Sequence, residues 1–119
     1  MFTGLVQAVG DVRELTPIAA GKRLVIAMPR ALFVEPEATP GESINIDGCC
    51  LSLVTSRPGE DGSLDVDFDA THQTLDNTTL GGLQPGDRVH LERSCTPTTL
   101  LGGHLVQGHV DGVARVIGV

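Results

Sequence analysis

The chain has 119 residues, of which 40% are hydrophobic and 19% charged, as is typical of one globular domain and not of a disordered chain or coiled coil. Fifteen acidic against eight basic residues give a formal net charge of −7, which argues against a polyanionic partner such as DNA or RNA. No apolar run approaches the roughly 20 residues that a membrane-spanning helix needs, and the first residues lack the basic and apolar blocks of a signal peptide.

Glycine and proline are frequent in the sequence, with 15 and 7 residues. Such a chain favours many short strands joined by turns over a few long helices. The aromatic residues are three Phe, with no Tyr or Trp, so a binding site cannot depend on stacking between aromatic rings. Recognition of a ligand must therefore come from the backbone and from small polar side chains.

In the first half of the chain, short apolar segments bounded by turn residues predict strands. These strands are expected over residues 5–15, 22–28, 43–47 and 49–56. Residues 30–34 are expected to form one helical turn, and residues 35–41, which include two prolines, a loop.

The alternation of apolar and polar residues is clearest over residues 63–70. Leu64, Val66 and Phe68 fall on one face of this expected strand, and three aspartates fall on the other. We interpret Asp65 and Asp67 as part of a solvated strand face.

After this strand the alternation breaks. Residues 71–80 are expected to form a short helix or coil with Thr71 as its N-cap. A Pro85–Gly86 turn then leads into a last strand over 87–93. About six short, mainly antiparallel strands predict an all-β fold, a six-stranded Greek-key barrel with short helical segments, because closure removes exposed strand edges.

An internal repeat suggests how the chain is divided. The motif GLVQ at 4–7 recurs as HLVQ at 104–107, followed in each case by a Val-rich stretch. We therefore expect a barrel over 1–95, a linker over 96–103, and, over 104–119, the first strand of a second, truncated repeat. The apolar face of that strand predicts self-association.

The three cysteines are Cys49, Cys50 and Cys95. An odd number of cysteines, two of them adjacent, does not indicate a disulfide framework. Neighbouring residues of a strand point to opposite faces, so Cys49 and Cys50 are not expected to pair with each other. Reduced cysteines indicate the cytoplasm. The usual C-x₂₋₄-C spacing of zinc sites is absent, so no metal site is expected.

Five motifs in order over nearly the whole chain resemble the riboflavin synthase alpha-chain family. They are MFTGLVQ at 1–7, NIDGCCLS at 45–52, QTL at 73–75 followed by TTLG at 78–81, GDRVHLER at 86–93, and GGHLVQGHV at 102–110.

The resemblance implies a fold and an activity. Chains of this family contain two homologous six-stranded barrels, usually assemble as trimers, and form each active site between the N-terminal barrel of one subunit and the C-terminal barrel of another. One 6,7-dimethyl-8-ribityllumazine donates a four-carbon unit to a second, giving riboflavin and 5-amino-6-ribitylaminouracil without a cofactor or metal.

The resemblance also implies site residues. Ser52 and Thr74 would supply hydroxyls to the lumazine, and Asp69, Thr71 and Gln73 are expected partners of its ribityl chain. The implied ligand-binding residues are Gly4, Leu5, Val6, Cys50, Leu51, Ser52, Asp69, Ala70, Thr71, His72, Gln73, Thr74, Gly108, His109 and Val110, and the implied catalytic residues are His109 and Cys50.

An imidazole suits the proton transfers of this reaction, because it titrates near neutrality. The alternatives are that His109 only packs at an interface and that Cys50 is a small core residue; His72 and His90 are expected at the surface. Gln73 stands where the family usually has Glu, and Ser52 where it usually has Thr. Because most of the second barrel is absent, a non-catalytic lumazine- or flavin-binding module remains the competing function.

Overall fold

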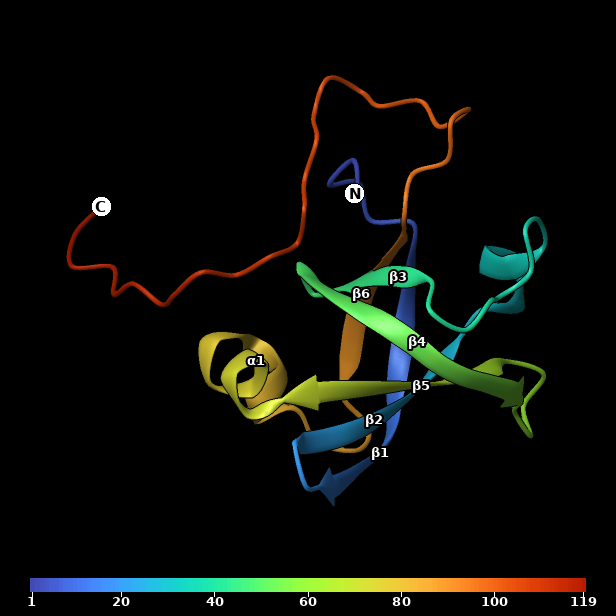
Figure 1. Cartoon of the computed structure of the whole chain (residues 1–119), viewed down its shortest axis with the longest axis horizontal. Helices are drawn as coiled ribbons and strands as arrows, with labels where there is room; N and C mark the ends of the chain where they lie inside the picture. The colour runs from blue at the N-terminus through green and yellow to red at the C-terminus, as the bar shows by residue number, and fades with distance from the viewer.

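Six antiparallel strands close into a barrel in the computed structural model, which describes residues 1–119 (Figure 1). The strands are β1 (Ala8–Ile18), β2 (Gly21–Met28), β3 (Ser43–Ile46), β4 (Cys49–Pro58), β5 (Leu64–Thr71) and β6 (Arg88–Arg93). Their order around the barrel is β1-β2-β5-β4-β3-β6, and β6 pairs with β1 to close it. The predicted all-β, six-stranded antiparallel barrel is confirmed.

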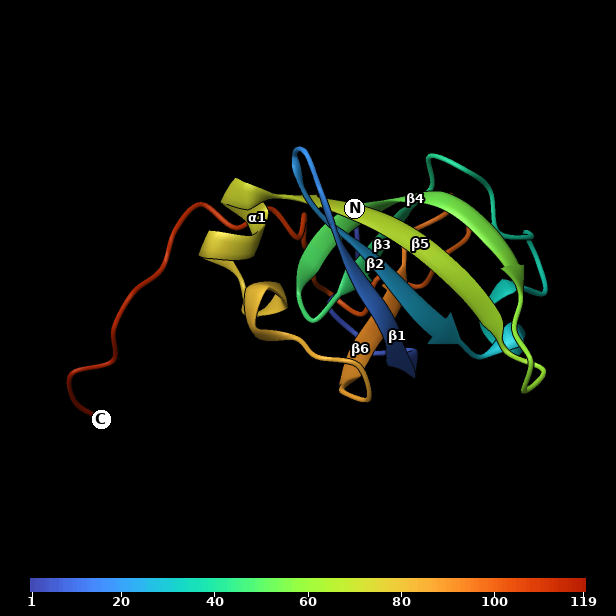
Figure 2. The same cartoon turned by 90° about the horizontal axis from the view of Figure 1, so that it is seen from below.

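Three short helical segments complete the fold: α1 (His72–Asn77) and the 3₁₀ turns η1 (Arg30–Phe33) and η2 (Thr79–Gly82). Helix α1 follows β5 directly and lies beside η2 at one end of the barrel (Figure 2). The Thr71 side chain accepts a hydrogen bond from Thr74 N at 3.2 Å, which confirms the predicted N-cap. None of these helices is both long and apolar enough to cross a membrane.

The core fills the barrel interior. Val66 and Phe68 of β5 are fully buried there, as their alternation predicted, and Leu24, Ile26 and Met28 of β2 pack with them. Each strand places alternate side chains inside, so a regular apolar pattern was sufficient to identify the inner face.

Strand β1 begins at Ala8 and not at Leu5, so the predicted start was wrong. The cause is the buried carboxylate of Glu92, which accepts hydrogen bonds from Thr3 N at 2.6 Å and Gly4 N at 3.0 Å. Gly4 takes a φ of +83°, and the chain turns before it joins the barrel. The strand then continues through Pro17, which is tolerated because only one edge of β1 is paired beyond Asp11.

The interpretation of Asp67 as a solvated residue was also wrong. Asp67 is only 7% exposed, and its carboxylate accepts a hydrogen bond from Arg57 Nη1 at 2.6 Å. Arg57 comes from the neighbouring strand β4, so the pairing of β4 with β5 brings its guanidinium to the carboxylate. Asp65 is half-buried near Arg13.

The pairing of Asp61 predicts part of the acid sensitivity of the barrel. Hydrogen bonds from Ser63 and from the Arg13 guanidinium lower the pKa of Asp61 to about 2, below the about 3.9 of an unfolded aspartate. Its stabilising contribution is therefore complete above about pH 4 and is lost as the pH falls toward the folded value. We expect the thermal midpoint of Asp61→Asn to decline less between about pH 4 and pH 2 than that of the wild type. Parallel midpoint curves from circular dichroism would contradict this.

Residues 104–119 do not form a regular strand. Val106 makes an isolated antiparallel bridge with Phe2, and residues 107–119 carry no secondary structure. Figure 1 shows this end of the chain running away from the barrel. A strand needs hydrogen-bonding neighbours along its length, and here the barrel offers them only at Phe2 and Cys50. The strand expected over 104–119 is thus not formed, and the division of the chain at 95 and 103 stays a prediction.

Candidate ligand-binding site

A small groove brings together three segments that lie far apart in the sequence. They are the start of β4, helix α1 and residues 108–110, which all lie at one end of the barrel (Figure 1). The groove has a volume of about 240 Å³. Its lining residues are Cys49, Cys50, Gln73, Thr74, Asn77, Thr78, Gly108, His109 and Val110. We call it the Cys50 groove.

The turn between β3 and β4 sets the position of the two cysteines. Asp47 and Gly48 both have positive φ, at 47° and 87°, and Gly48 N donates to Asn45 Oδ1 at 2.8 Å. Cys49 lies in the core and is 5% exposed. Burial is the main cause that raises the pKa of its thiol, and the neighbouring Cys50 raises it further. Because Cys49 stays protonated and packed inside, Cys50 is the accessible thiol of the groove.

Residues 104–110 dock against the barrel, and we call them the arm. Two hydrogen bonds, Phe2 N to Val106 O at 2.7 Å and Val106 N to Phe2 O at 2.8 Å, hold one point of it. A third, from Cys50 N to Gly108 O at 2.8 Å, fixes it beside the groove. The arm thereby carries His109 to the groove wall, where the imidazole is exposed.

Gly108 is required for this close approach. Its φ is +76°, and a Cβ at this position would lie 3.0 Å from both Cys50 N and Cys50 Cβ. We expect Gly108→Ala to weaken docking of the arm by about 1–3 kcal/mol. Hydrogen exchange at the Cys50 amide should then accelerate roughly ten- to hundredfold. Gly112→Ala, where an added Cβ meets nothing within 4 Å, is the matched control, and equal exchange in both variants would contradict the role of the arm.

The threonine side chains at the two ends of α1 form hydrogen bonds within the helix and its flanking residues. The Thr71 hydroxyl donates to Thr74 Oγ1 at 3.2 Å, and the Thr78 hydroxyl donates to Thr74 O at 2.7 Å and accepts from Leu80 N at 3.3 Å. These bonds satisfy the ends of the helix. Gln73 and Asn77 also line the groove, but their side chains make no hydrogen bond within the chain.

The Cys50 groove contains only some of the residues that the sequence indicated. It joins Cys50, Gln73, Thr74 and residues 108–110. The other indicated residues of β4, β5 and α1 lie elsewhere: Leu51 and Ala70 in the core, Ser52 and His72 exposed, Thr71 as the helix cap, and Asp69 paired with Arg23 at 2.7 Å. This pair lowers the pKa of Asp69 through the hydrogen bond from Arg23.

The N-terminal residues of the predicted site line a different cavity. Gly4 and Val6 border a space of about 400 Å³ that also includes Glu92 and Val106 of the arm. Leu5 is exposed. Glu92 is only 4% exposed. Its carboxylate accepts hydrogen bonds from the backbone N–H groups of Thr3 and Gly4 and so holds the N-terminal segment in place. The arm therefore borders both this cavity and the Cys50 groove.

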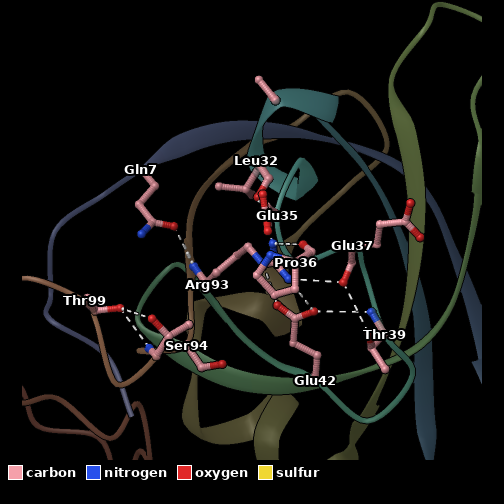
Figure 3. A pocket seen from close by; sticks show the side chains of 12 residues that line it. Gln7, Leu32, Glu35, Pro36, Glu37, Thr39, Glu42, Arg93, Ser94 and Thr99 are labelled. Carbon is pink, nitrogen blue, oxygen red and sulfur yellow. Dashed lines mark hydrogen bonds and ion pairs between the residues drawn. The ribbon is translucent and has the colours of Figure 1, made fainter.

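A larger cavity of about 530 Å³ surrounds Arg93 beside η1 and the loop that follows it (Figure 3). The guanidinium donates to both carboxylate oxygens of Glu42, at 2.6 and 2.9 Å, and to the carbonyls of Leu32 and Pro36. It also lies 4.7 Å from the ring centroid of Phe33. Because protein groups satisfy this cation, we interpret the cavity as a structural junction between η1, β3 and β6.

Sequence reasoning missed Cys49, Asn77 and Thr78 in the groove. The signal for Asn77 was present: it follows Gln73 by four residues, so the two share one face of a helix. Residues 71–80 were expected to be either helix or coil. Only in a helix do residues four positions apart lie on the same face.

Comparisons with known proteins agree with the fold. The family model described as lumazine binding domain matches residues 3–94. Riboflavin synthase of Mycobacterium tuberculosis is 40% identical over 117 residues, covering 98% of this chain and 55% of the relative. Crystal structures of LumP complexed with 6,7-dimethyl-8-(1'-D-ribityl) lumazine and with riboflavin are 26% and 27% identical, each with a TM-score of 0.72. They cover 94% of this chain and 58% and 56% of LumP.

The matched relatives are longer than this chain, and the family model matches most of it. The chain spans about half the length of the curated relatives it matches. The family match begins at the Thr3–Gly4 turn and ends just beyond β6, so it includes every strand of the barrel. The chain belongs to the lumazine-binding domain family.

Proposed function

We propose that the Cys50 groove binds 6,7-dimethyl-8-ribityllumazine and riboflavin, and that the chain acts as the N-terminal barrel of a riboflavin synthase. One observation carries the proposal. Cys50, Gln73 and His109, which the family resemblance marks from three distant segments, line one groove. The riboflavin synthases among its relatives and the ligands of LumP support the same ligand class.

The size of the groove supports a half-site. Its volume of about 240 Å³ is below the roughly 300–1,000 Å³ of most small-molecule pockets. A second barrel facing the groove would enclose the ligand and bring a second lumazine to it. The exposed Val113, Val116 and Ile117 beyond the arm offer an apolar surface for such a barrel or for another copy of the chain.

In the assembled protein the reaction would be a dismutation of two lumazines. A four-carbon unit passes from the donor to the acceptor, which becomes riboflavin, while the donor leaves as 5-amino-6-ribitylaminouracil. We assign to His109 the removal of a proton from a lumazine methyl group and the later proton transfers. Cys50, on the groove wall, is a second participant.

Recognition of the ring would depend on short polar contacts. A pyrimidinedione edge presents alternating carbonyl and N–H groups, which amide side chains and backbone groups complement. Cys50 N already donates to Gly108 O, so this amide is engaged while the arm is docked. The arm and Gln73 would then supply the remaining contacts. The three free cysteines suit the reducing cytoplasm, where we place the protein.

A non-catalytic flavin- or lumazine-binding module is the second candidate. The single barrel carries one small groove, whereas the dismutation needs two lumazines in one site. Turnover of the chain mixed with a C-terminal riboflavin synthase barrel distinguishes the two: product formation supports the enzyme, and binding without product supports the module.

Binding itself is tested by titration. The chain has no Trp or Tyr, so the fluorescence of riboflavin or the lumazine can be followed without interference. We expect saturable binding with a Kd below about 1 mM. Unchanged ligand fluorescence and anisotropy up to that concentration, equivalent to a binding free energy of only about −4 kcal/mol, would overturn the proposal.

A further inference from the structure

A buried polar side chain, Asn45, lies on the outer face of β3. Its neighbours Ile44 and Ile46 point into the core, so Asn45 points out of the barrel. Asn45 is nevertheless only 8% exposed. Strand pairing places it directly opposite Cys50 of β4 and Glu92 of β6. Its carboxamide therefore lies next to the accessible thiol of the groove, on the same face of the sheet.

The carboxamide lies between the two segments that meet at Cys50. Its Oδ1 accepts a hydrogen bond from Gly48 N at 2.8 Å, within the turn that leads into β4. On the other side, a Cβ added at Gly108 would lie 3.3 Å from Asn45 Nδ2. Gly108 O in turn accepts the hydrogen bond from Cys50 N at 2.8 Å. Asn45 thus lies against both the turn before Cys50 and the arm residue before His109.

A carboxamide buried to this extent costs free energy unless its polar atoms are bonded. A β-branched apolar residue would suit this strand position without that cost, so the polar group indicates a role beyond packing. We propose that Asn45 is a positioning residue, which holds the turn and the arm in the arrangement that places Cys50 and His109 in the groove. The inference rests on the proposed function, and Asn45 itself lies outside the groove.

Two substitutions of nearly equal size separate the hydrogen bond from packing. Asn45→Val removes the acceptor for Gly48 N, whereas Asn45→Thr keeps a side-chain oxygen that can bond a nearby backbone N–H. We expect Asn45→Val to accelerate hydrogen exchange at the Cys50 amide about three- to tenfold and to weaken riboflavin binding by the same factor, as loss of one hydrogen bond usually does. Asn45→Thr should stay within about twofold of the wild type in both measurements.

The same strand offers a matched control. Ser43 lies two residues before Asn45, on the same face of β3, and borders neither the groove nor the cavity beside Gly4. Ser43→Ala should therefore match the wild type. Exchange at the Phe68 amide of β5 reports opening of the barrel wall and should be equal in all variants. Should Asn45→Val fail to fold, Asn45→Ala takes its place.

The measurements separate this inference from the proposed function. Faster exchange and weaker binding in Asn45→Val, both restored in Asn45→Thr, support the positioning role. Values equal to those of Ser43→Ala, or faster exchange with unchanged riboflavin affinity, overturn it. Equal acceleration at Phe68 also overturns it, because Asn45 would then stabilise the whole barrel. A wild-type chain that binds no riboflavin overturns the proposed function, and the exchange rates of the two Asn45 variants still decide whether Asn45 places the arm.

Discussion

Arg93→Met is expected to lower the free energy of unfolding of the barrel by about 3–5 kcal/mol, the usual cost of removing one partner from a buried ion pair. The side chains of Arg93 and Glu42 are only 11% and 12% exposed. The substitution would leave the Glu42 carboxylate buried without its cation, and the carbonyls of Leu32 and Pro36 without their donor. It would also remove the guanidinium from the ring of Phe33.

Urea denaturation followed by circular dichroism measures this change. Arg88→Met is the matched control, because Arg88 lies on the same strand with a side chain 73% exposed, and surface substitutions usually change stability by less than about 0.5 kcal/mol. The double variant Glu42→Leu with Arg93→Met should recover part of the loss, since no unpaired charge remains. Equal effects of Arg93→Met and Arg88→Met would contradict the structural role of this junction.

The second large effect concerns His109. In a two-barrel protein, His109→Gln is expected to lower turnover by roughly ten- to a thousandfold, since loss of one general acid–base group usually costs about 10²–10⁴. The imidazole is exposed at the groove and packs in no core. Lumazine affinity and the thermal midpoint should therefore stay close to the wild-type values.

Steady-state kinetics with the lumazine tests this assignment. His104→Gln is the control, because His104 is exposed on the same arm and does not line the groove. Full activity of His109→Gln would remove His109 from the chemistry, and a large fall in its thermal midpoint would instead give it a structural role.

The barrel could be predicted from the sequence because its signals are local. Leu64, Val66 and Phe68 define an inner face by alternation alone, and Thr71 caps the helix that follows directly. The start of β1 could not be predicted in the same way. It depends on Glu92 of β6, which lies 89 residues after Thr3 in the sequence and whose carboxylate accepts hydrogen bonds from Thr3 N and Gly4 N. Asp67 likewise needed its partner Arg57 on the adjacent strand.

The site was predictable only where family motifs mark it. Cys50 and Gln73 were indicated by resemblance, and the structure adds that they share a groove with His109. Periodicity could not show that Asp69 is held by Arg23 on β2, because strand pairing decides which charges meet. Asn77 required a helix to be established first. The repeated motif at 104–107 could not show that residues 107–119 carry no strand, because the sequence does not reveal that the barrel bonds this segment only at Phe2 and Cys50.

The place where riboflavin binds distinguishes the Cys50 groove from the cavity around Arg93. Riboflavin can be added to the ¹⁵N-labelled chain while its amide signals are followed by NMR. We expect concentration-dependent shifts at Cys50, Gln73, Asn77 and His109, and no shift at Thr99 in the cavity around Arg93. Shifts confined to the cavity around Arg93, or no shifts at millimolar riboflavin, would contradict the assignment of the Cys50 groove as the ligand-binding site.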